Sequence, residues 1–135
     1  NAESYFRRAL TLDPNSADAE NGLGLALAKQ NRPEEAKKAF ERAIELRRGF
    51  GSAINNLGVL YSSLGDLSNA IAAFTYGTQA SPDDDTLYMN LASAYVQRGD
   101  REKARQVVQR WLDRKPGNTE ALRAEGLDQG LRRRA

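Results

Sequence analysis

A leucine followed by a very small residue recurs along this chain at one fixed interval. The pairs are Leu23-Gly24, Leu57-Gly58 and Leu91-Ala92, each 34 residues after the one before. Two further series keep the same step: one consists of Ala2, Ala36, Ala70 and Ala104, and the other of Phe6, Phe40, Phe74 and Val108. Three residue series with one shared period indicate an array of a single repeated unit.

Each unit has the pattern of two helices joined by a short turn. In the unit from Ala17 to Phe50, apolar residues follow helical spacing up to Leu27 and resume after Pro33, a residue that suits the first turn of a helix. The next two turns carry Gly65-Asp66 and Gly99-Asp100, in which glycine can end one helix and aspartate can cap the next. The sequence therefore predicts seven main helices, antiparallel within each unit, and no strand.

These motifs resemble the tetratricopeptide repeat. The resemblance runs through Leu57-Gly58-x-x-Tyr61, Ala70-x-x-x-Phe74 and Pro82, and again through Leu91-Ala92-x-x-Tyr95, Ala104 and Pro116. It implies an all-α fold, a helix-turn-helix repeat solenoid wound as a right-handed superhelix, with a C-terminal capping helix. The expected organisation is the second helix of a truncated repeat over 1–16, repeats over 17–50, 51–84 and 85–118, and a capping helix with a basic tail over 119–135.

The third unit departs from the pattern of the first two. It has Trp111 where they have Ala43 and Gly77, and Val108 where they have phenylalanine. We expect Trp111 to pack against the terminal helix. That helix keeps a small residue at Gly126 but has Glu125 and Gln129 where leucine and tyrosine would be, which suits the solvated cap that a repeat array needs at an open end.

Composition argues against several classes of function. The chain has no cysteine and no histidine, so disulfides, thiolate nucleophiles and the commonest general base and metal ligand are absent. Asp83-Asp84-Asp85 lacks the alternating ligands of a calcium loop, and we expect it to cap a helix. The sequence thus predicts no enzyme activity, no cofactor and no metal.

Neither nucleic acid nor a membrane is an expected partner. The net charge is only +2, and basic residues alternate with acidic ones along the helices. No apolar run approaches the length of a membrane span. The chain begins at Asn1 without a methionine, which suggests a piece of a longer protein, and its composition leaves the cellular compartment unknown.

Family resemblance places partner binding on the concave surface formed by the first helices. Most candidates there are uncharged, and they are Asn21, Gly22, Leu25, Lys29, Asn55, Asn56, Val59, Ser63, Met89, Asn90, Ser93 and Gln97. Asn56 and Asn90 are equivalent residues of successive units. An asparagine amide can donate to and accept from a peptide backbone at once, so a ladder of them could hold an extended chain. The alternative is that these amides are simply solvated.

One known mode of binding in the family does not fit this chain. Tetratricopeptide domains that grip a C-terminal carboxylate use lysine, arginine and asparagine at five places, which here hold Asn21, Leu25, Asn56, Thr86 and Asn90. Only Asn56 matches, and none of the five places holds a cationic residue that could pair with a carboxylate. The expected function is a non-enzymatic interaction module that binds a peptide or partner helix in a largely uncharged groove. The alternative is a structural or self-assembling segment of a larger protein.

Two apolar features could support such self-association. Tyr5 and Phe6 should face a first helix that this chain does not contain, so the N-terminal end could be covered by another copy. The alternative is that these rings fold onto Leu23 and Leu27 of the next unit. Tyr76 should lie toward the convex side, on a predicted helix that carries no charge from Ser68 to Ala80.

Overall fold

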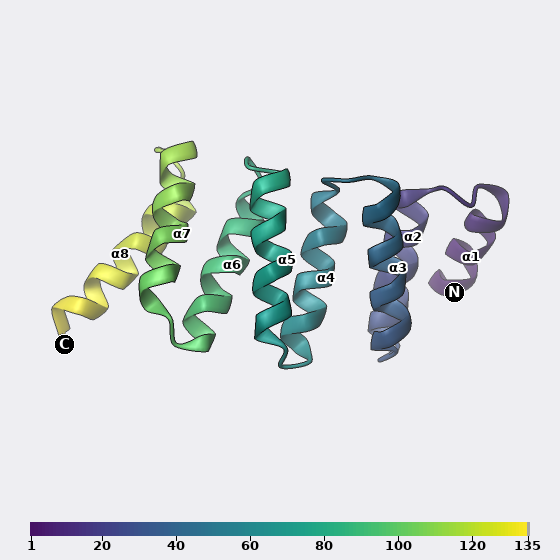
Figure 1. Ribbon diagram of the computed structural model, residues 1–135, viewed down its shortest axis with the longest axis horizontal. Helices are drawn as coiled ribbons and strands as arrows, with labels where there is room; N and C mark the ends of the chain where they lie inside the picture. Colours follow the sequence, from purple (N-terminus) through teal and green to yellow (C-terminus); the bar gives the residue numbers. More distant parts are fainter. Residues whose placement is uncertain (135) are drawn as a thin grey trace.

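The chain forms a single row of helices (Figure 1). The computed structural model describes the backbone of residues 1–134 and the side chains of residues 1–126. Within residues 1–134 there are eight helices and no strand: α1 Ala2–Leu12, α2 Ala17–Lys29, α3 Pro33–Leu46, α4 Gly51–Ser63, α5 Leu67–Ala80, α6 Asp85–Arg98, α7 Arg101–Arg114 and α8 Thr119–Arg134. The predicted all-α repeat solenoid, with a helix after its last helical pair, is confirmed. The side chains of the expected basic tail lie outside the described residues.

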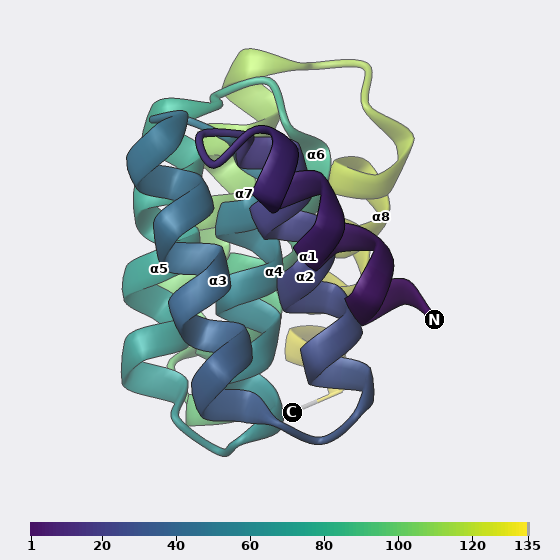
Figure 2. The same ribbon diagram turned by 90° about the vertical axis from the view of Figure 1, so that its right-hand side faces the viewer.

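The helices form two layers. In Figure 1 the second helices α3, α5 and α7 lie toward the viewer, and the first helices α2, α4 and α6 lie behind them. Figure 2, seen from the N-terminal end, shows α3 and α5 side by side with α2 and α4 next to them. Each second helix packs against both the first helix of its own unit and the first helix of the next. This packing joins the units into one continuous core.

The turns within the units follow the predicted chemistry. Gly65 and Gly99 have φ angles of 78° and 88°, the left-handed conformation that glycine adopts without a steric penalty. Asp66 then accepts a hydrogen bond from the Asn69 backbone N–H at 3.2 Å, which caps α5. The turn of the first unit instead uses Asn31 at φ 59°, a residue that tolerates this conformation better than most.

Small residues on the first helices allow close packing of the second helices. A Cβ atom added to Gly58 would lie 2.3 Å from Cε1 of Phe74, and one added to Gly24 would lie 2.5 Å from Cε1 of Phe40. These distances are far below van der Waals contact, so a larger residue would push the ring away. The period seen in the sequence is therefore a packing requirement.

Between α7 and α8 the large and the small side chain of a packing pair have changed places. In the preceding unit Gly77 lies under Leu87, whose Cδ2 would be 2.7 Å from a Cβ at residue 77. The equivalent residues 34 positions later are Trp111 and Ala121, so the large side chain now comes from the second helix and the small one from α8. Trp111 is about 1% exposed and belongs to the same core cluster as Ala121. The expected packing of Trp111 toward the terminal helix is thus observed.

The N-terminal helix α1 covers part of its own apolar surface. Phe6 is half-buried against the core cluster that contains Leu23 and Leu27, and its ring lies over Gly22. The Phe6 ring thus folds onto the next unit of its own chain, which is one of the two arrangements that the sequence allowed. Tyr5 packs edge-on against Phe6, with ring centroids 5.2 Å apart, yet remains about 69% exposed.

Candidate partner-binding face

The first helices present one shared set of exposed side chains, which we call the first-helix face. Within each helix these residues are spaced four apart, so they lie on one side of it. Their side chains are exposed, and they are Leu25 and Lys29 from α2, Val59 and Ser63 from α4, and Met89, Ser93 and Gln97 from α6. The predicted binding residues are thereby brought together, with Lys29 the single formal charge in the set.

The first-helix face lies on the inner side of the array. First helices of successive units contact each other, α2 with α4 and α4 with α6, more extensively than neighbouring second helices do. A solenoid curves toward the side on which its repeats approach most closely. The first-helix face therefore lies on the helices through which successive units approach each other most closely.

The four predicted asparagines pair with each other between helices. The Asn56 amide Nδ2 donates to Asn21 Oδ1 at 2.9 Å, and Asn90 Nδ2 donates to Asn55 Oδ1 at 2.6 Å. Asn21 is only about 8% exposed, and it also donates to Ser52 Oγ at 3.2 Å. These amides thus connect neighbouring units, a role that was not predicted because it depends on how two neighbouring first helices are rotated. Each donating amide has a second N–H and an acceptor oxygen, so Asn56 and Asn90 keep capacity for a partner.

Apolar side chains cross the first-helix face from one unit to the next. Leu25, Val59 and Met89 are exposed on three successive helices. Val96 extends the exposed apolar surface to the end of α6. Because an exposed apolar strip on several elements marks an interaction site more often than scattered single residues do, this strip favours binding.

A cavity of about 930 Å³ lies at the C-terminal end of this face, between α6, α7 and α8. The apolar members of its described lining include Val96 of α6, Ala104, Val108 and Trp111 of α7, and Ala124 of α8. None of these residues was predicted from the sequence to belong to the site. The replacement of phenylalanine by Val108 was the feature that could have revealed the cavity.

Ion pairs concentrate away from the first-helix face. Arg47 donates to both carboxylate oxygens of Asp18 at 3.1 Å, and this hydrogen bonding lowers the pKa of Asp18. Arg114 pairs with Asp83 at 3.0 Å at a later junction between units. The first pair joins the start of α2 to the end of α3 within one unit, and the second joins α7 to the loop before α6. Both lie outside the first-helix face, where Lys29 is the one charged residue of the defined set.

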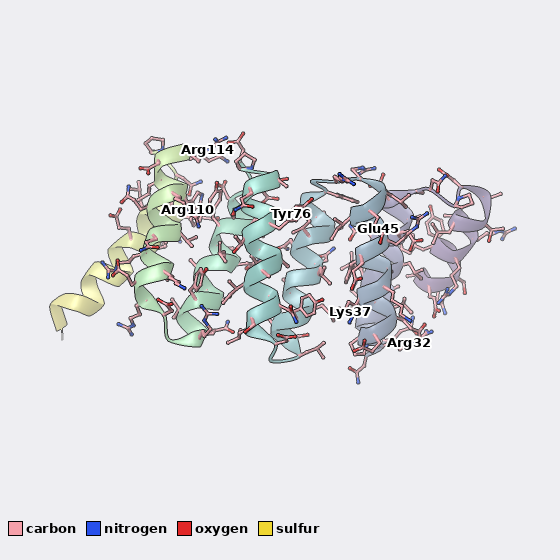
Figure 3. The ribbon with its side chains drawn as sticks, in the orientation of Figure 1. Arg32, Lys37, Glu45, Tyr76, Arg110 and Arg114 are labelled. Carbon is pink, nitrogen blue, oxygen red and sulfur yellow. The ribbon has the colours of Figure 1, made fainter. Side chains whose placement is uncertain are left out.

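The outer layer has an uncharged segment at α5. Figure 3 shows Tyr76 on α5 between the labelled Lys37 and Glu45 of α3 and the labelled Arg110 and Arg114 of α7. Tyr76 is exposed, as the sequence predicts for the convex side. No described contact identifies what could cover it.

The side chains of residues 1–126 contain no group of three or more acidic residues arranged to hold a metal ion. No helix in the described part of the chain is long and apolar enough to cross a membrane.

Models of a known protein family, and known proteins, match most of this chain. Two models of the tetratricopeptide repeat match it, one over residues 17–50 and the other over residues 62–126. Cellulose synthase operon protein C of Pseudomonas fluorescens is 28% identical over 129 residues, which is 90% of this chain and 10% of that protein. The chain thus spans about a tenth of the length of this relative.

Solved structures show the same arrangement of helices. The crystal structure of MamA has a TM-score of 0.75 and 26% identity, covering 95% of this chain and 69% of that chain. YrrB, described as a tetratricopeptide repeat protein with an unusual peptide-binding site, has a TM-score of 0.71 and 27% identity. That match covers 92% of this chain and 64% of the YrrB chain.

Proposed function

Because the chain belongs to the tetratricopeptide repeat family, a family of protein-interaction scaffolds, we propose that it binds a peptide or a helix of another protein on its first-helix face. The observation that carries this proposal is the exposure of Leu25, Val59 and Met89 on three successive helices of one inner surface. The likeness to YrrB, which is described as having a peptide-binding site, supports it.

The chemistry of the face favours a partner that is itself largely uncharged where it makes contact. Lys29 is the only charged residue among the exposed positions that define the face. The half-buried amides of Asn56 and Asn90 can bond to a peptide backbone, which every partner offers, while the apolar residues favour apolar side chains. A C-terminal carboxylate would find no cluster of cations here.

We propose a non-catalytic role, with no cofactor and no nucleic acid partner. The sequence offers neither histidine nor cysteine for acid–base or nucleophilic chemistry. Many basic residues pair with carboxylates, as Arg47 does with Asp18 of the same unit, instead of forming a basic stripe.

A selection experiment tests the proposal. Peptides displayed on phage are selected on the immobilised chain and depleted on a variant that carries both Leu25→Asp and Val59→Asp. Both residues are exposed, so the variant should fold, which circular dichroism checks. We expect a family of related sequences that the variant does not retain. Enrichment only of sequences that the variant retains equally would contradict the proposal.

Self-association is a second candidate, favoured by the exposure of Tyr5 and by the absence of any fully buried residue in α1. Sedimentation velocity over a wide concentration range tests it, with Tyr5→Asp measured beside the parent chain and Ser4→Asp as the control. A dimer that Tyr5→Asp alone dissolves would support this candidate. A parent that stays monomeric at high concentration would exclude it.

A further inference from the structure

The third unit lacks an aromatic ring that the first two units contain. Phe40 lies against Gly24 and Phe74 against Gly58, so in each unit a benzyl group fills the space over the small residue of the first helix. The equivalent pair in the third unit is Val108 over Ala92. Valine carries three side-chain carbons where phenylalanine carries seven, so the same packing leaves unfilled space.

The cavity of about 930 Å³ opens at this place. Ala92 and Val108 both line it, together with Val96 of α6, Ala124 of α8 and the buried Trp111. Its volume lies within the range of about 300–1,000 Å³ found for small-molecule sites. It can therefore hold an aromatic side chain together with part of the backbone that carries it.

The charges around the cavity balance. Its described lining includes Arg101, Arg105 and Arg123 together with Glu102, Glu120 and Glu125, and Arg105 forms an ion pair with Glu102 on the same helix. A rim with equal numbers of both charges selects neither an anion nor a cation. The apolar interior therefore determines which side chain the cavity accepts.

The cavity is continuous with the first-helix face. Met89, Ser93 and Gln97 belong to that face and also line the cavity. A peptide that crosses α2, α4 and α6 consequently reaches the cavity at the end of its path.

We propose that this cavity is an anchor site for a large aromatic side chain, tryptophan or phenylalanine, of the partner peptide. The incoming ring takes up space that Phe40 and Phe74 fill in their own units. This inference rests on the proposed function and deepens it, because it names the side chain that the partner must provide and the end of the array at which it binds.

The experiment uses the whole chain, labelled with ¹⁵N, and two small probes. N-acetyltryptophanamide is titrated beside N-acetylalaninamide, which has the same amide groups without the ring. We expect saturable shifts of the backbone amides of Ala92, Val96 and Val108 with the first probe only. Absence of saturable shifts at these residues up to the solubility limit of the probe would overturn the proposal.

Two variants make the result specific to the cavity. The double variant Ala92→Gly with Val108→Phe rebuilds the glycine–phenylalanine pair found twice in this chain, so it should fold while its own ring fills the space. Val96→Asp places a charge at an exposed position of the wall, and Ser62→Asp, 34 residues earlier, is its control. We expect N-acetyltryptophanamide to bind at least tenfold more weakly to the double variant and to Val96→Asp. For Ser62→Asp we expect less than a twofold change. Equal binding by all the variants would also overturn the proposal.

The same titration separates failure of this proposal from failure of the proposed function. Saturable shifts confined to Leu25 and Val59 would overturn the aromatic anchor at the cavity and leave the first-helix face as the binding surface. Selected peptides that lose no affinity when each of their aromatic residues is replaced by alanine would likewise overturn the anchor alone.

Discussion

The side-chain amide of Asn56 donates a hydrogen bond to Asn21 Oδ1 at 2.9 Å across the junction of α4 with α2. The same pairing recurs one unit later between Asn90 and Asn55, at 2.6 Å. A repeat array is held together only by contacts between neighbouring units. These asparagines of the first helices therefore contribute to the stability of the array, and Asn56 and Asn90 lie beside the surface offered to a partner.

Asn56→Ala should lower the free energy of unfolding by about 1 kcal/mol, the usual value of a lost hydrogen bond, because Asn21 loses a partner. Ser63→Ala, on the exposed part of the same helix, is the control and should change stability less. Urea unfolding followed by circular dichroism measures both. An unfolding midpoint for Asn56→Ala within error of the parent would show that the amide pair adds nothing.

Gly58→Ala should destabilise the chain by about 1–3 kcal/mol, because the new Cβ overlaps the Phe74 ring and the two helices must separate. Gly126→Ala is a matched control, since Gly126 is the equivalent residue of α8 and a Cβ there meets nothing within 4 Å. Alanine favours a helix over glycine by roughly 1 kcal/mol, so the control should be neutral or stabilising. Thermal unfolding of both variants tests this difference. A melting temperature that falls by the same amount in both variants would contradict the prediction.

The Trp111 indole N–H donates to Asp85 Oδ1 at 2.7 Å, and the indole stacks on Tyr88. This hydrogen bond, opposed by desolvation and supported by Lys115, lowers the pKa of Asp85. Asp85→Ala leaves a buried donor without its partner and should cost about 1–3 kcal/mol at pH 7. Asp85→Asn keeps an acceptor and should cost less.

The lowered pKa of Asp85 also sets the direction of a pH effect. Its stabilising contribution is complete above the unfolded-state pKa, about 4 for aspartate, and is lost as the pH falls through the lower folded-state pKa. The difference in unfolding free energy between the parent and Asp85→Asn should therefore shrink below about pH 4. A difference that is constant from pH 7 to pH 2.5 would show that the Asp85 charge has no part in it.

Glu20 occupies the position held by the buried Ile54 and Tyr88 in the next two units. Burial raises the pKa of Glu20, although Arg42 and Arg7 oppose the effect. A raised carboxyl pKa means that the contribution of Glu20 to stability is complete below its unfolded-state pKa, about 4.3, and is lost as the pH rises through the folded-state value. Glu20→Ile should therefore raise the free energy of unfolding at pH 7, by about 0.5–2 kcal/mol.

The pH dependence distinguishes this explanation from a gain in packing alone. Glu20→Gln removes the charge with little change of shape, so it should stabilise the chain at pH 7 and have less effect at pH 4. Denaturant unfolding at the two pH values measures the difference. Equal effects at both values would mean that the charge of Glu20 costs nothing in the folded chain.

The repeated packing of small residues against rings was predictable from the sequence, whereas the side-chain hydrogen bonds between helices were not. Gly58 and Phe74 recur at one period because each fits the other, and a period is visible without coordinates. Trp111 stood out by its size, but its hydrogen bond to Asp85 depends on how α6 and α7 align. The Asn56–Asn21 bond likewise depends on the rotation of two neighbouring first helices, which the residue spacing leaves open.

The residues of the candidate face could be assigned from the family resemblance, and helical spacing agrees with that assignment, whereas neither pointed to the cavity beside Val108. Helical spacing places residues four positions apart on one side of a helix, so Val59 and Ser63 could be assigned together. The cavity depends on where α8 lies relative to α6 and α7. The polar sequence of that terminal helix carries too weak a repeat pattern to fix its position.

Titration of one selected peptide against two charge variants of the same unit tests the central claim most directly. Val59→Asp places a carboxylate on the first-helix face, and Ala72→Asp places one at an exposed position of α5. Both should unfold at a temperature close to that of the parent, because both residues are exposed. Isothermal titration calorimetry should show binding weakened about tenfold or more by Val59→Asp, equivalent to ~1.4 kcal/mol, and changed less than about twofold by Ala72→Asp. The reverse order, or equal affinity for both variants, would contradict binding on the first-helix face.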